Sequence, residues 1–217
     1  MNIQLAKSIL KSALRRIIPQ RIRVRFTPYQ ACVKPEGKWN QEYTDGRWDS
    51  LEQVGELAHY SVVVGYCSSI KPHSAILDVG CGTGILIRQL RTAGFISYLG
   101  VDLSEKAIEQ AKKHQSEVVR FEVANAEAFQ PREEYDVIIF NEILYYFPDP
   151  RRVVSRYAEY LRSGGIVIIS MHRTPNSRKI WRLLEGCGNV RDAVCVTNTI
   201  NRLTWDIRVY AKPEGTQ

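Results

Sequence analysis

The sequence predicts an α/β fold in which helices cover both faces of a mostly parallel sheet. Strand-like and helical patterns alternate from about residue 60 to residue 185. Residues 135–140 form a continuous apolar run, which is typical of a strand buried on both faces. A glycine-rich turn at residues 80–84 joins another apolar run to a helical pattern. The 217 residues suit one sizeable domain with a short appendage.

Residues 1–26 form a basic arm with seven Lys or Arg residues and no acid. Without these seven, 23 of the 30 basic residues remain, which equals the 23 acidic residues, so the net charge of +7 belongs to the arm. Residues 3–18 have the pattern of an amphipathic helix that Pro19 ends. Such a helix either lies on an anionic membrane surface or acidic partner, or packs on its own domain. A transit peptide has a similar composition.

The next segment, residues 27–60, is polar and carries Trp39, Tyr43 and Trp48 around an Asp-Gly turn. These aromatic side chains either form the wall of a ligand pocket or anchor a small separate core. A helix is expected over residues 50–70. Its predicted buried face carries the following side chains: Leu51, Val54, Leu57, Ala58 and Val62.

An apolar strand at residues 75–79 ends at Gly80, Gly82 and Gly84, and a helix follows. Glycines permit a sharp turn and a close approach to a ligand. The free amides of the next helix would receive a carboxylate or phosphate. No Lys-Ser or Lys-Thr pair follows, which excludes a GxxxxGK[ST] phosphate loop, and Ile85 replaces the third glycine of a dinucleotide fingerprint.

A second strand, residues 98–102, ends in Asp102, and Ser104 is expected to cap the helix that begins at residue 105. Asp102 lies 20 residues beyond Gly82, the distance at which a second-strand carboxylate reaches a bound ribose. The alternative is an exposed acid that is favourable near a helix N-terminus.

This GxGxG loop, with Asp78 before it and Asp102 after it, resembles that of class I S-adenosylmethionine (SAM) methyltransferases. The resemblance covers roughly residues 35–211. It implies a Rossmann-like sheet of seven strands, the first five parallel and one C-terminal strand antiparallel, with SAM as cofactor and no metal. It also implies that residues 27–60 are a lid over the cofactor and acceptor, and that residues 61–217 are the SAM-binding domain. The expected cofactor-binding residues are Tyr43, Asp78, Gly80, Cys81, Gly82, Gly84, Asp102, Leu103, Asn125, Ala126, Glu127 and Asn141.

A third strand at residues 118–124 is followed by Asn125, Ala126 and Glu127. Methyltransferases of this type usually carry Asp-Ala or a similar pair here, and the acid accepts a hydrogen bond from the adenine amine. Asn125 departs from that pattern. Its side-chain carbonyl still accepts one hydrogen bond, so we keep the assignment as an expectation.

The strand at residues 135–140 leads into residues 141–148, a run that resembles one in small SAM methyltransferases, including nodulation N-methyltransferases. That local match does not identify the substrate of this chain. A helix is expected from Asp149-Pro150 to Arg162, ending at Gly164-Gly165. Beyond it we expect a strand at 166–170, a helix around 179–184, and two final strands at 190–198 and 203–210.

The candidate catalytic residues are Glu142, Tyr145 and His172, which follow the fourth and fifth strands. A hydroxyl acceptor favours His172 as the base. With an amine acceptor, Glu142 would mainly orient the ammonium. The alternative is that His172 is an ordinary strand-end residue and Glu142 caps a turn.

The expected function is methyl transfer to an oxygen or nitrogen atom of a small molecule, for example a sugar, lipid or secondary metabolite. The alternatives are an RNA methyltransferase or a SAM-binding regulator without turnover. The absence of an Asn-Pro-Pro-Tyr type motif weakens nucleobase methylation, so nucleic acid is not an expected partner. Five cysteines without a CxxC pair, and no apolar run of membrane-spanning length, indicate a cytoplasmic protein with an optional membrane contact through the arm. The acceptor and the oligomeric state are not specified by the sequence.

Overall fold

The computed structural model describes residues 28–91 and 94–212. The chain divides into residues 1–30 and a compact unit of residues 31–217, which carries the fold. The basic arm, its predicted helix at 3–18 and its predicted membrane contact therefore lie outside the described residues. Within the described ranges, no helix is both long and apolar enough to cross a bilayer.

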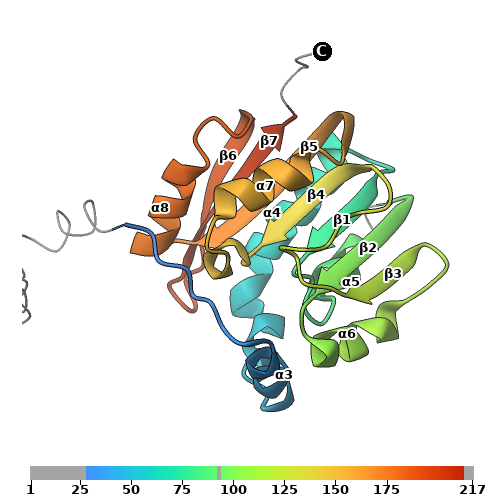
Figure 1. Cartoon of the computed structure of the whole chain (residues 1–217), viewed down its shortest axis with the longest axis vertical. Helices are drawn as coiled ribbons and strands as arrows, with labels where there is room; N and C mark the ends of the chain where they lie inside the picture. The colour runs from blue at the N-terminus through green and yellow to red at the C-terminus, as the bar shows by residue number, and fades with distance from the viewer. Residues whose placement is uncertain (1–27, 92–93, 213–217) are drawn as a thin grey trace, which may run out of the picture. The chain divides into compact units, whose positions relative to one another are not determined.

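Seven strands form one sheet in the order β3-β2-β1-β4-β5-β7-β6 (Figure 1). β1 to β5 are parallel, and β7 runs antiparallel to both β5 and β6. This arrangement confirms the predicted Rossmann-like sheet. The strands are β1 (Ala75–Val79), β2 (Ser97–Asp102), β3 (Val119–Val123), β4 (Tyr135–Asn141), β5 (Leu161–His172), β6 (Asn189–Thr197) and β7 (Thr204–Ala211).

Helices cover both faces of the sheet, with α7 in front of the strands in Figure 1 and α4 behind them. Buried side chains of α4, α5 and α6 share one core with the sheet residues that face them. On the other face, the ring of Tyr157 in α7 meets Phe140 of β4 edge to face. The α-helices are α3 (Glu36–Thr44), α4 (Val54–Ile70), α5 (Ile85–Leu90), α6 (Glu105–Ala111), α7 (Pro150–Ala158) and α8 (Pro175–Leu183). The described ranges also contain three short 3-10 helices, η1 (Asp49–Glu52), η2 (Lys112–His114) and η3 (Leu144–Tyr146).

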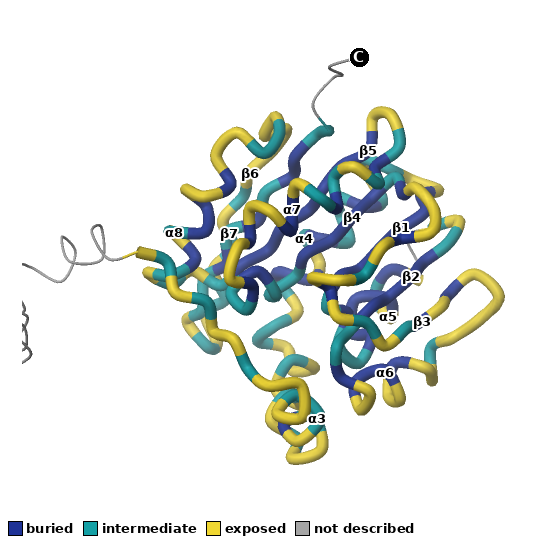
Figure 2. Tube along the Cα trace, viewed as in Figure 1, coloured by how far each residue is buried: buried dark blue, intermediate teal, exposed yellow. Residues whose placement is uncertain are grey.

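The central strands are the most deeply buried part of the fold, as the dark tube in Figure 2 shows. All five residues of β1 are buried, and so are Val137 to Phe140 in β4. Apolar side chains on both faces of a strand require cover on both faces. The central strands therefore form a rigid platform whose carboxyl ends meet at one edge.

Two sequence-based expectations are wrong in detail. The helix expected to reach Arg162 ends at Ala158, and Leu161 already pairs with Tyr135 in the sheet. Gly164 has a φ of 68°, so it permits a bend within β5 rather than ending the helix. In α4, Val54 and Leu57 are exposed, and the residues actually buried are His59, Tyr60, Val63 and Cys67.

Candidate functional site

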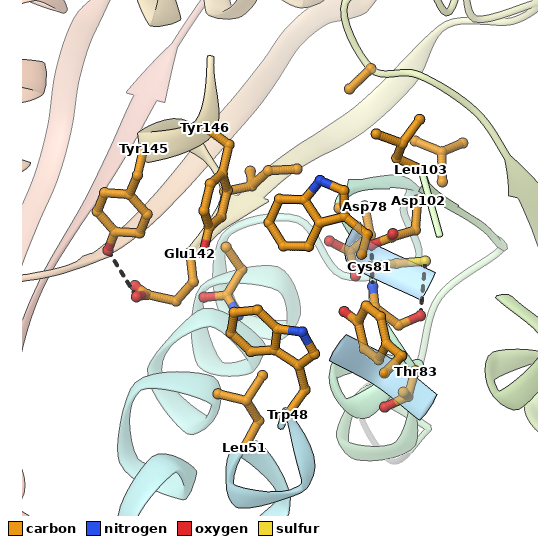
Figure 3. Close-up of a pocket in the computed structure, with 18 of the residues that line it drawn as sticks. Trp48, Leu51, Asp78, Cys81, Thr83, Asp102, Leu103, Glu142, Tyr145 and Tyr146 are labelled. Carbon is orange, nitrogen blue, oxygen red and sulfur yellow. Dashed lines mark hydrogen bonds between the residues drawn. The ribbon is translucent and has the colours of Figure 1, made fainter. Parts of the chain in front are cut away.

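A cavity of ≈ 390 Å³ lies where the carboxyl ends of β1 to β4 meet the segment of residues 33–60 that was predicted to be a lid. Its wall includes Asp78 and residues 80–83 of the glycine loop on one side and Glu142, Tyr145 and Tyr146 on the other (Figure 3). Gly84, also a predicted cofactor-binding residue, is not part of this wall. The predicted site residues Tyr43, Cys81, Leu103, Asn125, Ala126, Glu127 and Asn141 also line it. Ligands of open α/β sheets gather at this edge.

The glycine loop takes backbone angles that only glycine adopts readily. Gly80, Gly82 and Gly84 all have positive φ values, of 77°, 53° and 79°. A Cβ atom on Gly80 would lie 2.1 Å from Cδ1 of Ile143. The amides of Gly80 and Cys81 both donate to the carbonyl of Val101, at 2.8 and 3.0 Å. These bonds fix the loop against β2.

Asp102 holds two loops together at the end of β2. Its carboxylate accepts hydrogen bonds from the amides of Gly82 and Ser104, both at 2.9 Å. Ser104 caps α6, as predicted, by accepting from the amide of Ala107 at 3.2 Å. Burial raises the pKa of Asp102, while the backbone donors of Ser104, Gly82 and Leu103 oppose that rise. Lone pairs on the carboxylate remain for a ligand in the cavity.

Asp78 at the end of β1 is fully enclosed. Its Oδ2 accepts a 2.6 Å hydrogen bond from the hydroxyl of Tyr98. Oδ1 is buried and has no partner in the described structure. Burial raises the pKa of Asp78 to about 7. A hydrogen-bond donor or a positive charge placed at Oδ1 would stabilise the ionised form of this carboxyl group.

The turn after β3 is held from outside the cavity. Asn125 Oδ1 accepts from the amide of Glu127 at 2.9 Å, so this side chain caps its own turn. The carbonyl of Ala126 accepts from the hydroxyl of Tyr157 at 3.0 Å and from Arg156. The predicted hydrogen bond that Asn125 accepts from the adenine amine would therefore share an oxygen that already accepts from Glu127.

Glu142 lies at the end of β4 in a left-handed conformation, with φ of 59°. Its Oε2 accepts a 2.8 Å hydrogen bond from Tyr145, and its Oε1 is buried without a partner in the described residues (Figure 3). Burial raises the pKa of Glu142 to about 8. Backbone strain of this kind gathers at functional sites. The sequence contained no signal for this left-handed backbone conformation of Glu142.

The third predicted catalytic residue, His172, is not brought to the cavity wall. It is half-buried, with its ring 6.0 Å from that of Trp205 on β7, and burial lowers its pKa. The cavity instead contains Glu56 and Tyr60 of α4, which sequence reasoning missed as site residues. Only the helical position of Glu56, one turn before Tyr60, links the two in the sequence.

The lid carries a cation enclosed by aromatic rings. The ammonium of Lys34 lies 4.3, 5.1 and 5.5 Å from the ring centroids of Trp39, Trp48 and Tyr146. The same ammonium pairs with the buried Glu42 at 2.7 Å. Both tryptophans line the cavity, so the pocket-wall alternative describes them.

The segment predicted to be a lid is joined to the rest of the fold by defined hydrogen bonds. The amide of Cys32 donates to the carbonyl of Tyr145 at 2.8 Å, and Ser104 donates to Asn40 at 2.8 Å. Tyr43 places its hydroxyl 3.0 Å from the position of a Cβ on Gly82. This segment thus contacts both the glycine loop and Tyr145, next to Glu142.

The cavity suits a ligand rich in hydrogen-bond donors. Buried oxygens of Asp78, Asn141 and Glu142 have no partner within the described residues, and unmet acceptors in a protein interior are costly. SAM offers an ammonium and two ribose hydroxyls, and its sulfonium is positive. In the described ranges no group of three or more His, Cys, Asp or Glu side chains has the arrangement of a metal site.

Comparison with known proteins gives a consistent result. A methyltransferase domain family model matches residues 70–207. Ubiquinone biosynthesis O-methyltransferase of Thiobacillus denitrificans is 39% identical over 143 residues, which cover 64% of this chain and 58% of the relative. The same-named protein of Aromatoleum aromaticum is 39% identical over 44% of this chain and 42% of its own length. The chain therefore spans about half the length of the curated relatives it matches.

Solved structures share the fold at low sequence identity. N-methyltransferase NodS of Bradyrhizobium japonicum, in complex with S-adenosylhomocysteine (SAH), has a TM-score of 0.68 at 17% identity, covering 82% of this chain and 98% of NodS. A 1,6-didemethyltoxoflavin N1-methyltransferase of Burkholderia thailandensis has a TM-score of 0.70 at 18% identity, covering 87% and 95%. At these identities, the similarity shows that the proteins share a fold.

Proposed function

Because the chain belongs to the methyltransferase domain family, we propose that it transfers a methyl group from SAM to an oxygen or nitrogen atom of a small molecule. The observation that carries this proposal is the meeting of the glycine loop, Asp102 and Glu142 in one covered cavity. The glycine loop and Asp102 suit cofactor binding, and Glu142 suits proton transfer from the acceptor. The lid would cover both ligands.

The cofactor half of the cavity is assigned to the glycine loop and the ends of β1 to β3. Asp102 would accept from the ribose hydroxyls, and the first-turn amides of α5 with Asp78 would hold the methionine end. The turn at Asn125 to Glu127 would border adenine, and Tyr43, Cys81, Leu103 and Asn141 would complete the wall. The sulfonium activates the methyl group, so that an acceptor lone pair forms the new bond while the carbon–sulfur bond breaks and its electrons go to sulfur.

The remaining task of the protein is to orient the acceptor and exclude water. Glu142 is assigned as the group that accepts the acceptor's proton, because it lines the cavity and has an oxygen without a partner. Tyr145 positions its carboxyl. His172 enters this proposal only in second place, as a base acting from outside the cavity wall.

Two further proposals concern the surroundings of the enzyme. Five cysteines are free thiols, which supports a reducing compartment such as the cytoplasm. The seven positive charges of residues 1–26 support a peripheral contact with anionic membranes. A role in RNA methylation is not favoured, because acidic side chains dominate the cavity wall.

The test is transfer of a tritiated methyl group from SAM to small molecules of a cell extract. Wild type is expected to label a low-molecular-weight product, and Glu142→Gln is expected to lower that rate by ~10²–10⁴ with SAM affinity unchanged. His172→Asn should stay within a few-fold of wild type. Label that appears only in RNA, or no transfer by a protein that binds SAM, would contradict the proposal.

A further inference from the structure

The cavity wall is strongly acidic. Within the described residues, its lining contains one basic side chain, Lys34, and six carboxyl groups. These are Glu36, Glu56, Asp78, Asp102, Glu127 and Glu142. The ammonium of Lys34 is already paired with Glu42 at 2.7 Å. The cavity therefore has an excess of carboxyl groups over basic groups, which favours a cationic ligand.

Two of these carboxyl groups lie outside the part assigned to the cofactor. Glu56, in the first turn of α4, and Glu142, at the end of β4, both line the cavity. The charge of Glu56 is one cause of the raised pKa of Glu142. Both carboxyls, with Asp78, also raise the pKa of Tyr60. Glu56 and Glu142 thus influence each other and Tyr60, which lines the same cavity.

Neither carboxyl has a cation to balance it among the described residues. Oε1 of Glu56 accepts a 3.3 Å hydrogen bond from the side-chain amide of Asn201, and Oε2 lies 3.7 Å from Nδ1 of His59. His59 is fully buried and its pKa is lowered to about 3, so this ring is neutral at pH 7. Glu142 accepts a side-chain hydrogen bond from the neutral hydroxyl of Tyr145, and its Oε1 has no hydrogen-bond partner in the described part of the chain.

We propose that Glu56 and Glu142 form the seat of a protonated amino group, so that the methyl acceptor is a primary or secondary amine. This inference rests on the proposed methyltransferase function and narrows its acceptor. An alcohol or phenol needs only one proton acceptor, and a carboxylate or phosphate would be repelled by two acids. An ammonium satisfies both carboxyls and the free Oε1 at once.

The same pair prepares the amine for reaction. An ammonium has no free lone pair, so it must first lose a proton. The Glu142 carboxylate takes one proton from R–NH₃⁺, which leaves R–NH₂ with its lone pair and Glu142 as a neutral acid. The methylated product carries the positive charge again, and Glu142 returns its proton to water when the product leaves. Glu56 keeps the nitrogen in place.

A pair of probes of equal shape tests the charge preference. Benzylamine and benzyl alcohol would be titrated into SAH-loaded protein and followed by NMR. We expect the amine to bind at least about tenfold more tightly than the alcohol. Glu56→Gln and Glu142→Gln should each remove about tenfold of that preference. Glu36→Gln, which removes an exposed acid from the same cavity wall, should leave it unchanged.

Equal binding of the two probes, no binding of the amine, or an equal loss in Glu36→Gln would overturn the inference. Mass spectrometry of the product from the tritiated screen adds a second readout. An N-methyl product supports the amine seat, and an O-methyl product overturns it while leaving the methyltransferase proposal intact. Failure to bind SAM at all would instead contradict the proposed function.

Discussion

The hydroxyl of Tyr145 donates a 2.8 Å hydrogen bond to Oε2 of Glu142, the acid that ends β4. This bond joins two residues only three positions apart, and it is made possible by the positive φ of Glu142. The conformation turns the carboxyl into the cavity and leaves Oε1 for a ligand. The backbone conformation of Glu142 and the hydrogen bond from Tyr145 together orient the Glu142 carboxyl group as a proton acceptor.

Tyr145→Phe removes that donor, so Oε2 of Glu142 would lose its partner. The hydrogen bond lowers the pKa of Glu142 against the effect of burial, and its loss should raise that pKa further. We expect kcat/KM to fall about tenfold and its rising limb to move to higher pH. The pH profile of methyl transfer measures this. An unshifted profile would show that Tyr145 does not position the base.

The stability of the ligand-free protein should fall with rising pH. The pKa of Glu142 is raised from 4.5 to about 8 and that of Asp78 from 3.8 to about 7, so the folded state binds more protons than the unfolded state in this range. The free energy of unfolding therefore decreases as pH rises through these values. Urea unfolding at pH 5 and pH 8 tests this. Glu142→Gln should flatten the dependence, and a stability that rises over this range would contradict these protonation states.

Asp102→Ala should weaken the binding of SAM and SAH by about 1–3 kcal/mol, since a charged hydrogen-bond partner is lost. The amides of Gly82 and Ser104 would also lose their acceptor, so the melting temperature must be measured beside the affinity. Calorimetry gives the affinity. Unchanged binding in a folded variant would remove the ribose assignment.

Gly80→Ala should disturb the cofactor loop. Its φ of 77° is unfavourable for alanine, and the new Cβ would lie 2.1 Å from Cδ1 of Ile143. We expect a loss of about 1–3 kcal/mol in stability together with weaker SAM binding. Gly65→Ala in α4 is the matched control, because nothing lies within 4 Å of its Cβ, and it should stabilise by about 1 kcal/mol. Equal effects of the two substitutions would contradict the loop geometry.

Deleting residues 1–26 should leave SAM affinity unchanged and abolish binding to anionic vesicles. The arm carries seven positive charges, and its attraction to such a surface should weaken as salt rises. Flotation with anionic and with neutral vesicles measures this. Full-length protein that stays unbound at low salt would contradict the surface-helix hypothesis.

The sheet and the glycine loop were predictable because their signals are local. An apolar run such as residues 135–140 has few alternatives to a buried strand, and three glycines at alternate positions mark a tight turn. The end of α7 was predicted wrongly because glycines terminate helices and also permit bends in strands. Gly164 does the second.

The acceptor side was less predictable because it depends on contacts between distant segments. α4 is apolar around much of its surface, so periodicity did not identify its buried face, and Glu56 was missed. His172 was predicted from its residue type and its position at the end of a strand, but it does not line the cavity. Burial, which decides the charge state of Glu142, follows from the tertiary fold alone.

Calorimetric titration of the wild-type protein with SAM, and with NAD for comparison, tests the central claim most directly. The cavity geometry predicts saturable binding of SAM at one site per chain and no tight binding of NAD, since Ile85 stands where the dinucleotide loop needs glycine. Tight binding of NAD with no binding of SAM would contradict the account.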